Sequence, residues 1–204
     1  MPFTHQFFDK NTAIDDVIFN ATPAHRVKQT HSSDVTEVNS PQTEWIEADG
    51  IITRTPNLPI GVITADCTPV LFYGDGVVGA AHAGWQGAVS GALENTVTAM
   101  KCAPENIHAY IGPCISQKSY EVSIGFEKPF LDHNPESERF FRAERVSDKL
   151  QFDLAGYCAF RLALCDVKHI HIDGTDTLTH DNFHSHRGGA SSTERNLSAI
   201  MING

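Results

Sequence analysis

Short apolar runs bounded by Asp, Gly or Pro recur through the first half of the chain. Runs of this kind, rich in β-branched residues, predict buried strands. Two of them flank Gly74-Asp75-Gly76, a three-residue loop whose glycines permit the positive φ values of a tight hairpin. The strands predicted here are residues 35–38, 50–53, 60–64, 70–73 and 77–81.

The spacing of apolar residues then changes to steps of three and four, which predicts a helix from about Gln86 to Met100, ended before Pro104. A second helix is predicted from about Asp153 to Cys165. Further strands are expected at residues 107–111, 167–172 and 197–202, with loop and edge structure over 132–149.

Strands interrupted by few helices, with hairpins as well as crossovers, indicate an α+β fold. We expect a layered sandwich with a mixed β-sheet and flanking helices, in a single domain. Residues 1–25 show no comparable pattern and are expected to be an N-terminal segment of poorly specified structure, followed by a domain over residues 26–204.

The chain has 204 residues, enough for one domain with a sizeable core. Its formal charge of −10 argues against binding to a phosphate backbone. The longest apolar runs are far shorter than the roughly 18 residues of a membrane span, and no basic segment leads into an apolar one as in a secretory signal. We therefore expect a cytoplasmic protein with a small-molecule substrate and no nucleic-acid or membrane partner.

Five cysteines, an odd number, argue against a disulfide framework. Three segments each place one soft-metal ligand beside a strand end or turn: His31, Cys67 and His82. Two imidazoles and one thiolate form a three-ligand site with a free fourth position, as in catalytic zinc sites. The spacing has no CxxC or HExxH arrangement, so by itself it leaves metal binding and a metal-free site both open.

Two pairs of histidines, 169/171 and 184/186, match the HxH pattern of copper oxidases. The chain has no His-Cys-His segment, and only Met100 and Met201 besides the first residue could supply an axial thioether. A blue-copper centre is therefore not indicated.

Five segments resemble the successive motifs of the laccase-domain family, also called the bacterial polyphenol oxidase-like or purine nucleoside phosphorylase family. The resemblance implies a zinc-type site at His31, Cys67 and His82, where Cu²⁺ is also possible. It further implies phosphorolysis of adenosine, inosine and methylthioadenosine, and deamination of adenosine. The segments are QTHSSDV (29–35), ADGIIT (48–53), TADCTPVLF (64–72), AAHAGWQG (80–87) and IGPCISQKSYEV (111–122), and FHSHR (183–187) is similar to the family's FYSYR-like segment.

The resemblance suggests further roles for residues inside these motifs. Asp66 joins Cys67 and His82 as a candidate catalytic residue, and Asp49 and Asp66 are candidates to orient a ligand His or a ribose; each is also a candidate turn carboxylate capping its own backbone. Trp85 is a candidate to stack on a purine, or simply to pack.

The chain also departs from the family pattern. Gln86 stands where Arg usually follows HAGW, Asp176-Thr177 replaces the usual CT pair, and the TGR-like end reads Thr193-Glu194-Arg195. Arg187 and Arg195 remain candidates to bind phosphate. We expect weak phosphate affinity, because the neutral Gln86 cannot supply a positive charge.

Three other functions compete with this interpretation. A metal-free cysteine hydrolase or deamidase would use Cys67 as nucleophile and His82 as base. A copper-dependent polyphenol oxidase would use the same three ligands for copper. A non-enzymatic role, such as a peptidoglycan quality-control factor, needs no catalysis.

Overall fold

The computed structural model describes residues 2–16, 18–19, 22–41, 45–143 and 148–204. Its strands form a six-stranded sheet in the order β11-β7-β5-β6-β3-β2 and two three-stranded sheets, β1-β12-β4 and β8-β10-β9. The strands are β1 (Phe3–Phe7), β2 (Val35–Glu37), β3 (Gly50–Thr53), β4 (Ile60–Thr64), β5 (Thr68–Gly74), β6 (Val77–Ala83), β7 (His108–Ile111), β8 (Glu121–Ser123), β9 (Phe141–Ala143), β10 (Lys149–Phe152), β11 (His169–Ile172) and β12 (Asn196–Ile202). The helices are α1 (Trp85–Ser90), α2 (Ala92–Met100), α3 (Lys128–His133) and α4 (Leu154–Leu164), with 3₁₀ turns η1 (Pro104–Asn106) and η2 (Pro135–Phe140).

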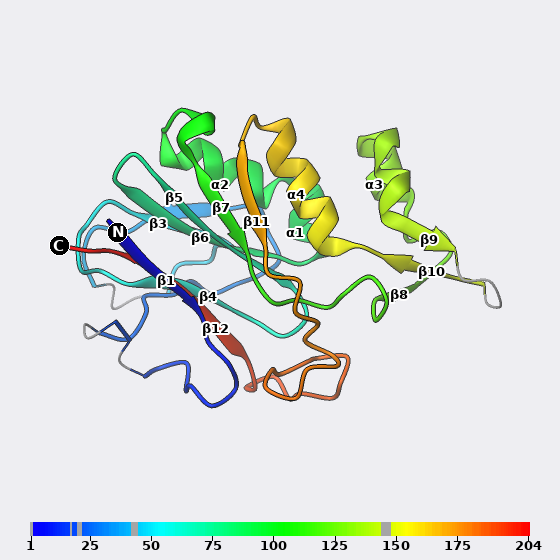
Figure 1. The fold of residues 1–204 in the computed structure, drawn as a ribbon, viewed down its shortest axis with the longest axis horizontal. Coiled ribbons are helices and arrows are strands. Elements are labelled where there is room, and N and C mark those ends of the chain that lie inside the picture. Colours follow the sequence, from blue (N-terminus) through cyan, green and yellow to red (C-terminus); the bar gives the residue numbers. More distant parts are fainter. Residues whose placement is uncertain (1, 17, 20–21, 42–44, 144–147) are drawn as a thin grey trace.

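The six-stranded sheet is the middle layer of a sandwich. Figure 1 shows helices α1, α2 and α4 on one side of it and strands β1, β12 and β4 on the other. Side chains alternate between the two faces of the sheet: Ile52 and Phe72 pack on the helix side, whereas Ile51 and Leu71 pack towards β4 and β12. The sheet is mixed, because β11 pairs with β7 and β2 with β3 in parallel while its other pairs are antiparallel. The predicted α+β layered sandwich is confirmed.

The helix predicted over 86–100 is two helices. Gly91 adopts the left-handed conformation (φ 97°), and its N–H bonds to the carbonyl of Gly87, which ends α1; α2 begins at the next residue. The helix predicted over 153–165 is confirmed as α4, and the Asp153 carboxylate caps it by accepting a 2.8 Å hydrogen bond from the N–H of Gly156.

One other local prediction is wrong, and two are incomplete. The hairpin turn consists of Asp75 and Gly76 alone, because Gly74 pairs with Val77. The first 25 residues contain β1, which pairs antiparallel with β12 at the far end of the chain. The stretch expected as loop and edge, 132–149, is largely exposed and contains β9, an edge strand of the sheet β8-β10-β9, but it also contains the 3₁₀ turn η2; its residues 144–147 lie outside the described residues.

Within the described ranges, no helix is both long enough and apolar enough to cross a membrane.

A buried arginine ties α4 to the helix that begins at the candidate site. The side chain of Arg161, 5% exposed, forms an ion pair with Glu94 and donates to the carbonyls of Ala88 (2.9 Å) and Val89 (3.1 Å) and to the Tyr157 hydroxyl (2.7 Å). The two carbonyls belong to the last turn of α1, where they have no partner within the helix. Arg161 therefore satisfies two free carbonyls of α1 and holds this helix against α4.

Replacing Arg161 with Met should lower the free energy of unfolding by about 3–5 kcal/mol, because Glu94 and the two carbonyls lose a partner in a buried setting. Urea denaturation followed by circular dichroism measures the change. Lys168→Met is the matched control: its ion pair with Asp166 is exposed, so its loss should cost about 0.5 kcal/mol or less. A similar cost for both variants would show that the buried network is unimportant.

Candidate functional site

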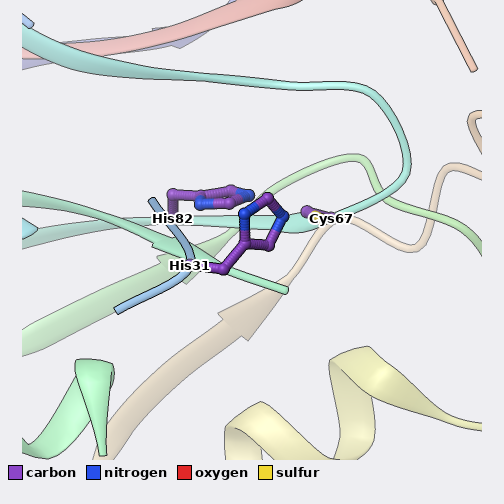
Figure 2. Close-up of side chains that lie close together, drawn as sticks. All are labelled: His31, Cys67 and His82. Atoms are coloured by element: carbon purple, nitrogen blue, oxygen red, sulfur yellow. The ribbon is translucent and has the colours of Figure 1, made fainter. Parts of the chain in front are cut away.

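Three side chains from separate segments meet at one end of the six-stranded sheet. His31 comes from the loop before β2, Cys67 from the turn between β4 and β5, and His82 from the end of β6. One donor atom from each lies within 4.8 Å of the others, and Figure 2 shows the three side chains together. Elsewhere in the described part of the chain no further group of three such ligands occurs. The sequence-predicted set is therefore brought together.

The carboxylate of Asp49 organises this site. It is fully buried and accepts hydrogen bonds from the N–H groups of Thr30 (3.1 Å), His31 (3.1 Å) and Ser32 (2.6 Å). Its Oδ1 also lies 2.7 Å from Nδ1 of His82. Asp49 thus positions the loop that carries His31 and leaves Nε2 of His82 as the atom available to a ligand.

Gln29 fixes the same loop against β4. Its side-chain amide donates to the carbonyl of Ile63 (2.8 Å) and accepts from the N–H of Ile63 (2.9 Å), as a neighbouring strand would. The motif QTHSSDV contains this residue, but only the pairing with β4 reveals its purpose.

Gly84 leaves the space in front of the ligands free. A Cβ at this position would lie 3.0 Å from Sγ of Cys67 and 3.0 Å from Cδ2 of His31. Contacts this short are tighter than ordinary van der Waals packing. Glycine is therefore required here by the approach of two ligand side chains.

Asp66 acts on the turn that carries Cys67. It has a left-handed backbone (φ 82°), and its carboxylate accepts from the Thr177 hydroxyl (2.7 Å) and from the N–H of Arg187 (2.7 Å). Both carboxylate oxygens therefore have partners in the C-terminal loop, and Asp66 links that loop to the turn of Cys67.

Electrostatics set an unusual protonation pattern in the absence of metal. Burial alone would raise the pKa of Asp49, but hydrogen bonds from His82 and Ser32 outweigh it and hold this pKa well below its usual range. Burial alone would lower the pKa of His82, yet the partners Asp49 and Cys67 raise it to about 9. Burial would raise the pKa of Cys67, but hydrogen bonds from His31 and His82 lower it to about 6. At neutral pH the metal-free site thus pairs a thiolate with an imidazolium.

Two cavities adjoin the three ligands, and His31 lines both. The larger, about 650 Å³, also contains Cys67 and His82; the smaller, about 510 Å³, lies against α1. The larger cavity is lined by Arg26, Val27, Lys28, Gln29, Trp45, Ile63, Thr64, Ala65, His186 and Arg195 together with the ligands, and the smaller by Thr30, Trp85, Gln86, Val89, Ser90 and Pro129 with His31.

The other predicted site residues lie in the smaller cavity, in the larger cavity or outside both. Trp85 and Gln86 line the smaller cavity. Arg187 is not among the described residues that line either cavity: its guanidinium donates to the Glu121 carbonyl (3.1 Å) and lies over the ring of Tyr120. Arg195 lines the larger one.

Neither HxH pair joins the group formed by His31, Cys67 and His82. His169 stacks on His108 with ring centroids 4.3 Å apart, and His171 stacks on Tyr110 at 5.1 Å. Among the described residues of the second pair, His186 reaches the rim of the larger cavity.

Three residues outside the predicted set shape the site: Gln29, Arg26 and Trp45. Gln29 lies inside a recognised motif. Arg26 and Trp45 meet only in space, where the guanidinium lies 5.4 Å from the centroid of the indole. Trp45, three residues before the ADG motif, is the sequence signal that could have indicated this wall of the cavity.

Comparisons with known proteins show which family and which proteins this chain is similar to. The sequence model of a family described as "Multi-copper polyphenol oxidoreductase laccase" matches residues 9–203. A Rickettsia prowazekii protein named purine nucleoside phosphorylase RP494 is 32% identical, over 98% of this chain and 91% of its own length. The Escherichia coli protein named purine nucleoside phosphorylase YfiH is 34% identical, over 79% of this chain and 67% of its own length.

Solved structures share the fold. The Neisseria meningitidis protein NMB0706 superposes with a TM-score of 0.79 at 34% identity, over 88% of this chain and 74% of that one. The Bacillus licheniformis protein YfiH superposes with a TM-score of 0.85 over 98% and 93% of the two chains. At 22% identity, this second structure shows a shared fold and nothing more.

In metal-stripped protein, Cys67 should be alkylated by iodoacetamide at a rate that rises with pH and levels off above a midpoint near pH 6, because only the thiolate reacts. The pKa values of the other four cysteines are raised, chiefly by burial, so they should react slowly at neutral pH. Mass spectrometry of the modified peptides gives each rate.

Two variants control this experiment. Cys67→Ser should lose the fast reaction, and Asp49→Asn should move the midpoint to higher pH, because His82 loses the carboxylate that keeps it protonated. A wild-type midpoint near the ordinary thiol pKa of about 8.5 would contradict the described hydrogen bonding.

Proposed function

The chain belongs to the family described as multi-copper polyphenol oxidoreductase laccase, and from this premise we propose that it is a metal-dependent purine nucleoside phosphorylase. The observation that carries the proposal is the set His31, Cys67 and His82, which lines the larger cavity and of which His31 and His82 are positioned by Asp49. The name of the Rickettsia relative, similar along almost the whole chain, supports the substrate class. The proposed substrates are adenosine, inosine and methylthioadenosine, with phosphate as the second substrate.

The chemistry of the donor set fits a catalytic zinc ion. Two imidazole nitrogens and one thiolate are three protein ligands, and Gly84 keeps the space before two of them free. A zinc ion held there would supply a Lewis acid that polarises a substrate oxygen. Cu²⁺ suits the same donors, so either metal is compatible with the residues.

The protein's own groups set up this site. Asp49 accepts a hydrogen bond from Nδ1–H of His82 and thereby turns Nε2 towards the ligand position. Hydrogen bonds from His31 and His82 lower the pKa of Cys67 to about 6 and thereby provide a thiolate at neutral pH. Asp66 anchors the turn of Cys67 to the C-terminal loop, so we assign it a positioning role.

Phosphorolysis needs two substrates side by side, and His31 lines both cavities. In this reaction the bond between ribose C1′ and the purine nitrogen breaks, and a phosphate oxygen bonds to C1′. The base leaves with the electron pair of the broken bond and takes up a proton. Adenosine deamination, in which water replaces the 6-amino group and ammonia leaves, is proposed as a further reaction of the same site.

A metal-free cysteine hydrolase or deamidase is the second candidate, favoured by one observation. Without metal, Cys67 and His82 form a thiolate–imidazolium pair, which is the resting state of an activated cysteine nucleophile. The two candidates differ in whether activity requires the metal.

Protein purified without added metal should carry one ion per chain, and Cys67→Ala should lose most of that metal together with about 100-fold or more of its activity. Elemental analysis and inosine consumption in phosphate buffer measure the two quantities. Metal affinity should fall as pH drops, because binding must displace protons from Cys67 and His82.

Cys102→Ala is the matched control, because this half-buried thiol bonds to the carbonyl of Gly74 at the far end of β5. It should keep both metal and activity. Full metal occupancy in Cys67→Ala would refute the ligand assignment. Activity that survives metal removal but not Cys67→Ala would favour the cysteine hydrolase, and copper with phenol oxidation would favour the oxidase.

Gln86→Arg should lower the KM for phosphate by about 10- to 100-fold, since a charge-assisted hydrogen bond to an anion contributes about 1.5–3 kcal/mol. Gln86 is exposed and lines the smaller cavity, so the longer side chain has room to reach an anion there. The measurement is ribose 1-phosphate formation against phosphate concentration. Gln86→Leu should leave the KM high; an unchanged KM in Gln86→Arg would place phosphate elsewhere.

A further inference from the structure

Trp45 is a large aromatic side chain left open to solvent beside the three ligands. It is 62% exposed and lines the larger cavity together with His31, Cys67 and His82. Burying an indole normally stabilises a protein, so an exposed one at the rim of a cavity marks a surface available to a ligand. The other exposed large hydrophobic residues, Ile46, Ile124, Leu164 and Ile172, do not line this cavity.

Arg26 holds this indole in place. Its side chain is only 9% exposed, its guanidinium lies 5.4 Å from the centre of the Trp45 ring, and it forms an ion pair with Asp15. A cation over an aromatic ring is attracted to the ring's negative face. The ring is therefore oriented before any ligand arrives, and much of its surface stays exposed.

Trp85, the aromatic residue that the motif made the first candidate for stacking, is placed differently. Its ring packs against Phe126 (centroids 5.1 Å apart) and Phe130 (6.4 Å), and the residue is only half-exposed. It therefore belongs largely to the packing between α1 and α3.

We propose that the purine base of the substrate stacks on Trp45, with Arg26 as a positioning residue for the indole. This inference rests on the proposed function and adds the subsite for the base. The cavity volume of about 650 Å³ is within the range of small-molecule sites and accommodates a nucleoside. Val27, Ile63 and Ala65 add apolar lining suited to a flat base, and His31, Cys67 and His82 line the same cavity, so the ribose would lie towards them.

Stacking on Trp45 also accounts for a preference for purines over pyrimidines. Aromatic stacking accepts any base, because each base has a π-face, and it strengthens with the area in contact. The two-ring purine therefore gains more from the indole than the single ring of a pyrimidine. Trp45→Ala should weaken purine binding about 10-fold and reduce the discrimination against uridine.

The direct test is binding of inosine and of free hypoxanthine to the full-length, metal-loaded protein, measured by calorimetry. Trp45→Ala should raise both dissociation constants about 10-fold, Trp45→Phe should restore most of the binding, and Arg26→Gln should give a smaller loss. Ile124→Ala, which removes a comparably exposed apolar side chain elsewhere, should change neither. In turnover assays Trp45→Ala should raise the KM for inosine with little change in kcat.

Fluorescence gives an independent readout. The chain contains two tryptophans, so a Trp85→Phe background leaves Trp45 as the single indole, and hypoxanthine should quench it to saturation. Absence of quenching, or unchanged binding in Trp45→Ala, would overturn the inference even if the protein cleaves nucleosides. Purine binding that depends on Trp45 but is not accompanied by phosphorolysis would instead contradict the proposed reaction and support the subsite for the base.

Discussion

The buried carboxylate of Asp49 is the constraint on which the site depends. An ionised carboxylate without partners would be very costly inside the protein, so the fold must bring donors to it. The donors are the N–H groups of residues 30–32 and the ring of His82. The same bonds hold His31 in its left-handed conformation (φ 61°) and aim His82. The positions of two proposed metal ligands are thus consequences of satisfying one charge.

The sequence predicts best where a segment's structure follows from its own residues. Strands β3, β5 and β6 were recognisable because both faces of the central sheet are apolar, and α4 because its cap and apolar face lie within one segment. Strand β1 was not predicted, since its partner β12 lies almost at the other end of the chain. The break at Gly91 was missed because the apolar spacing continues across it into α2. Each failure involves either a distant partner or a single backbone conformation.

The same distinction separates the parts of the candidate site. The three ligands lie inside motifs and were predicted together, and the structure places their donor atoms together. Arg187 lies in a motif as well, yet its guanidinium faces Glu121 and Tyr120, because Asp66 fixes the backbone of that loop. The pair of Arg26 and Trp45 joins two loops that have no relation in sequence. Motifs therefore indicate the chemistry, whereas the walls of the cavities depend on tertiary contacts.

Charge decides which substrate each cavity suits. Basic residues line the larger cavity, but Arg26 is paired with Asp15 and Lys28 with Glu47, so two of the positive charges there are already compensated. Arg195 lines the same cavity and donates to the backbone carbonyls of Ser191 and Glu194. The exposed indole of Trp45 and the apolar residues of the lining favour a neutral flat base. The smaller cavity offers hydroxyl and amide groups without a cation among its described lining residues. An anion there must rely on neutral donors and on a metal at His31, so phosphate is the substrate whose binding is most sensitive to the residue at position 86.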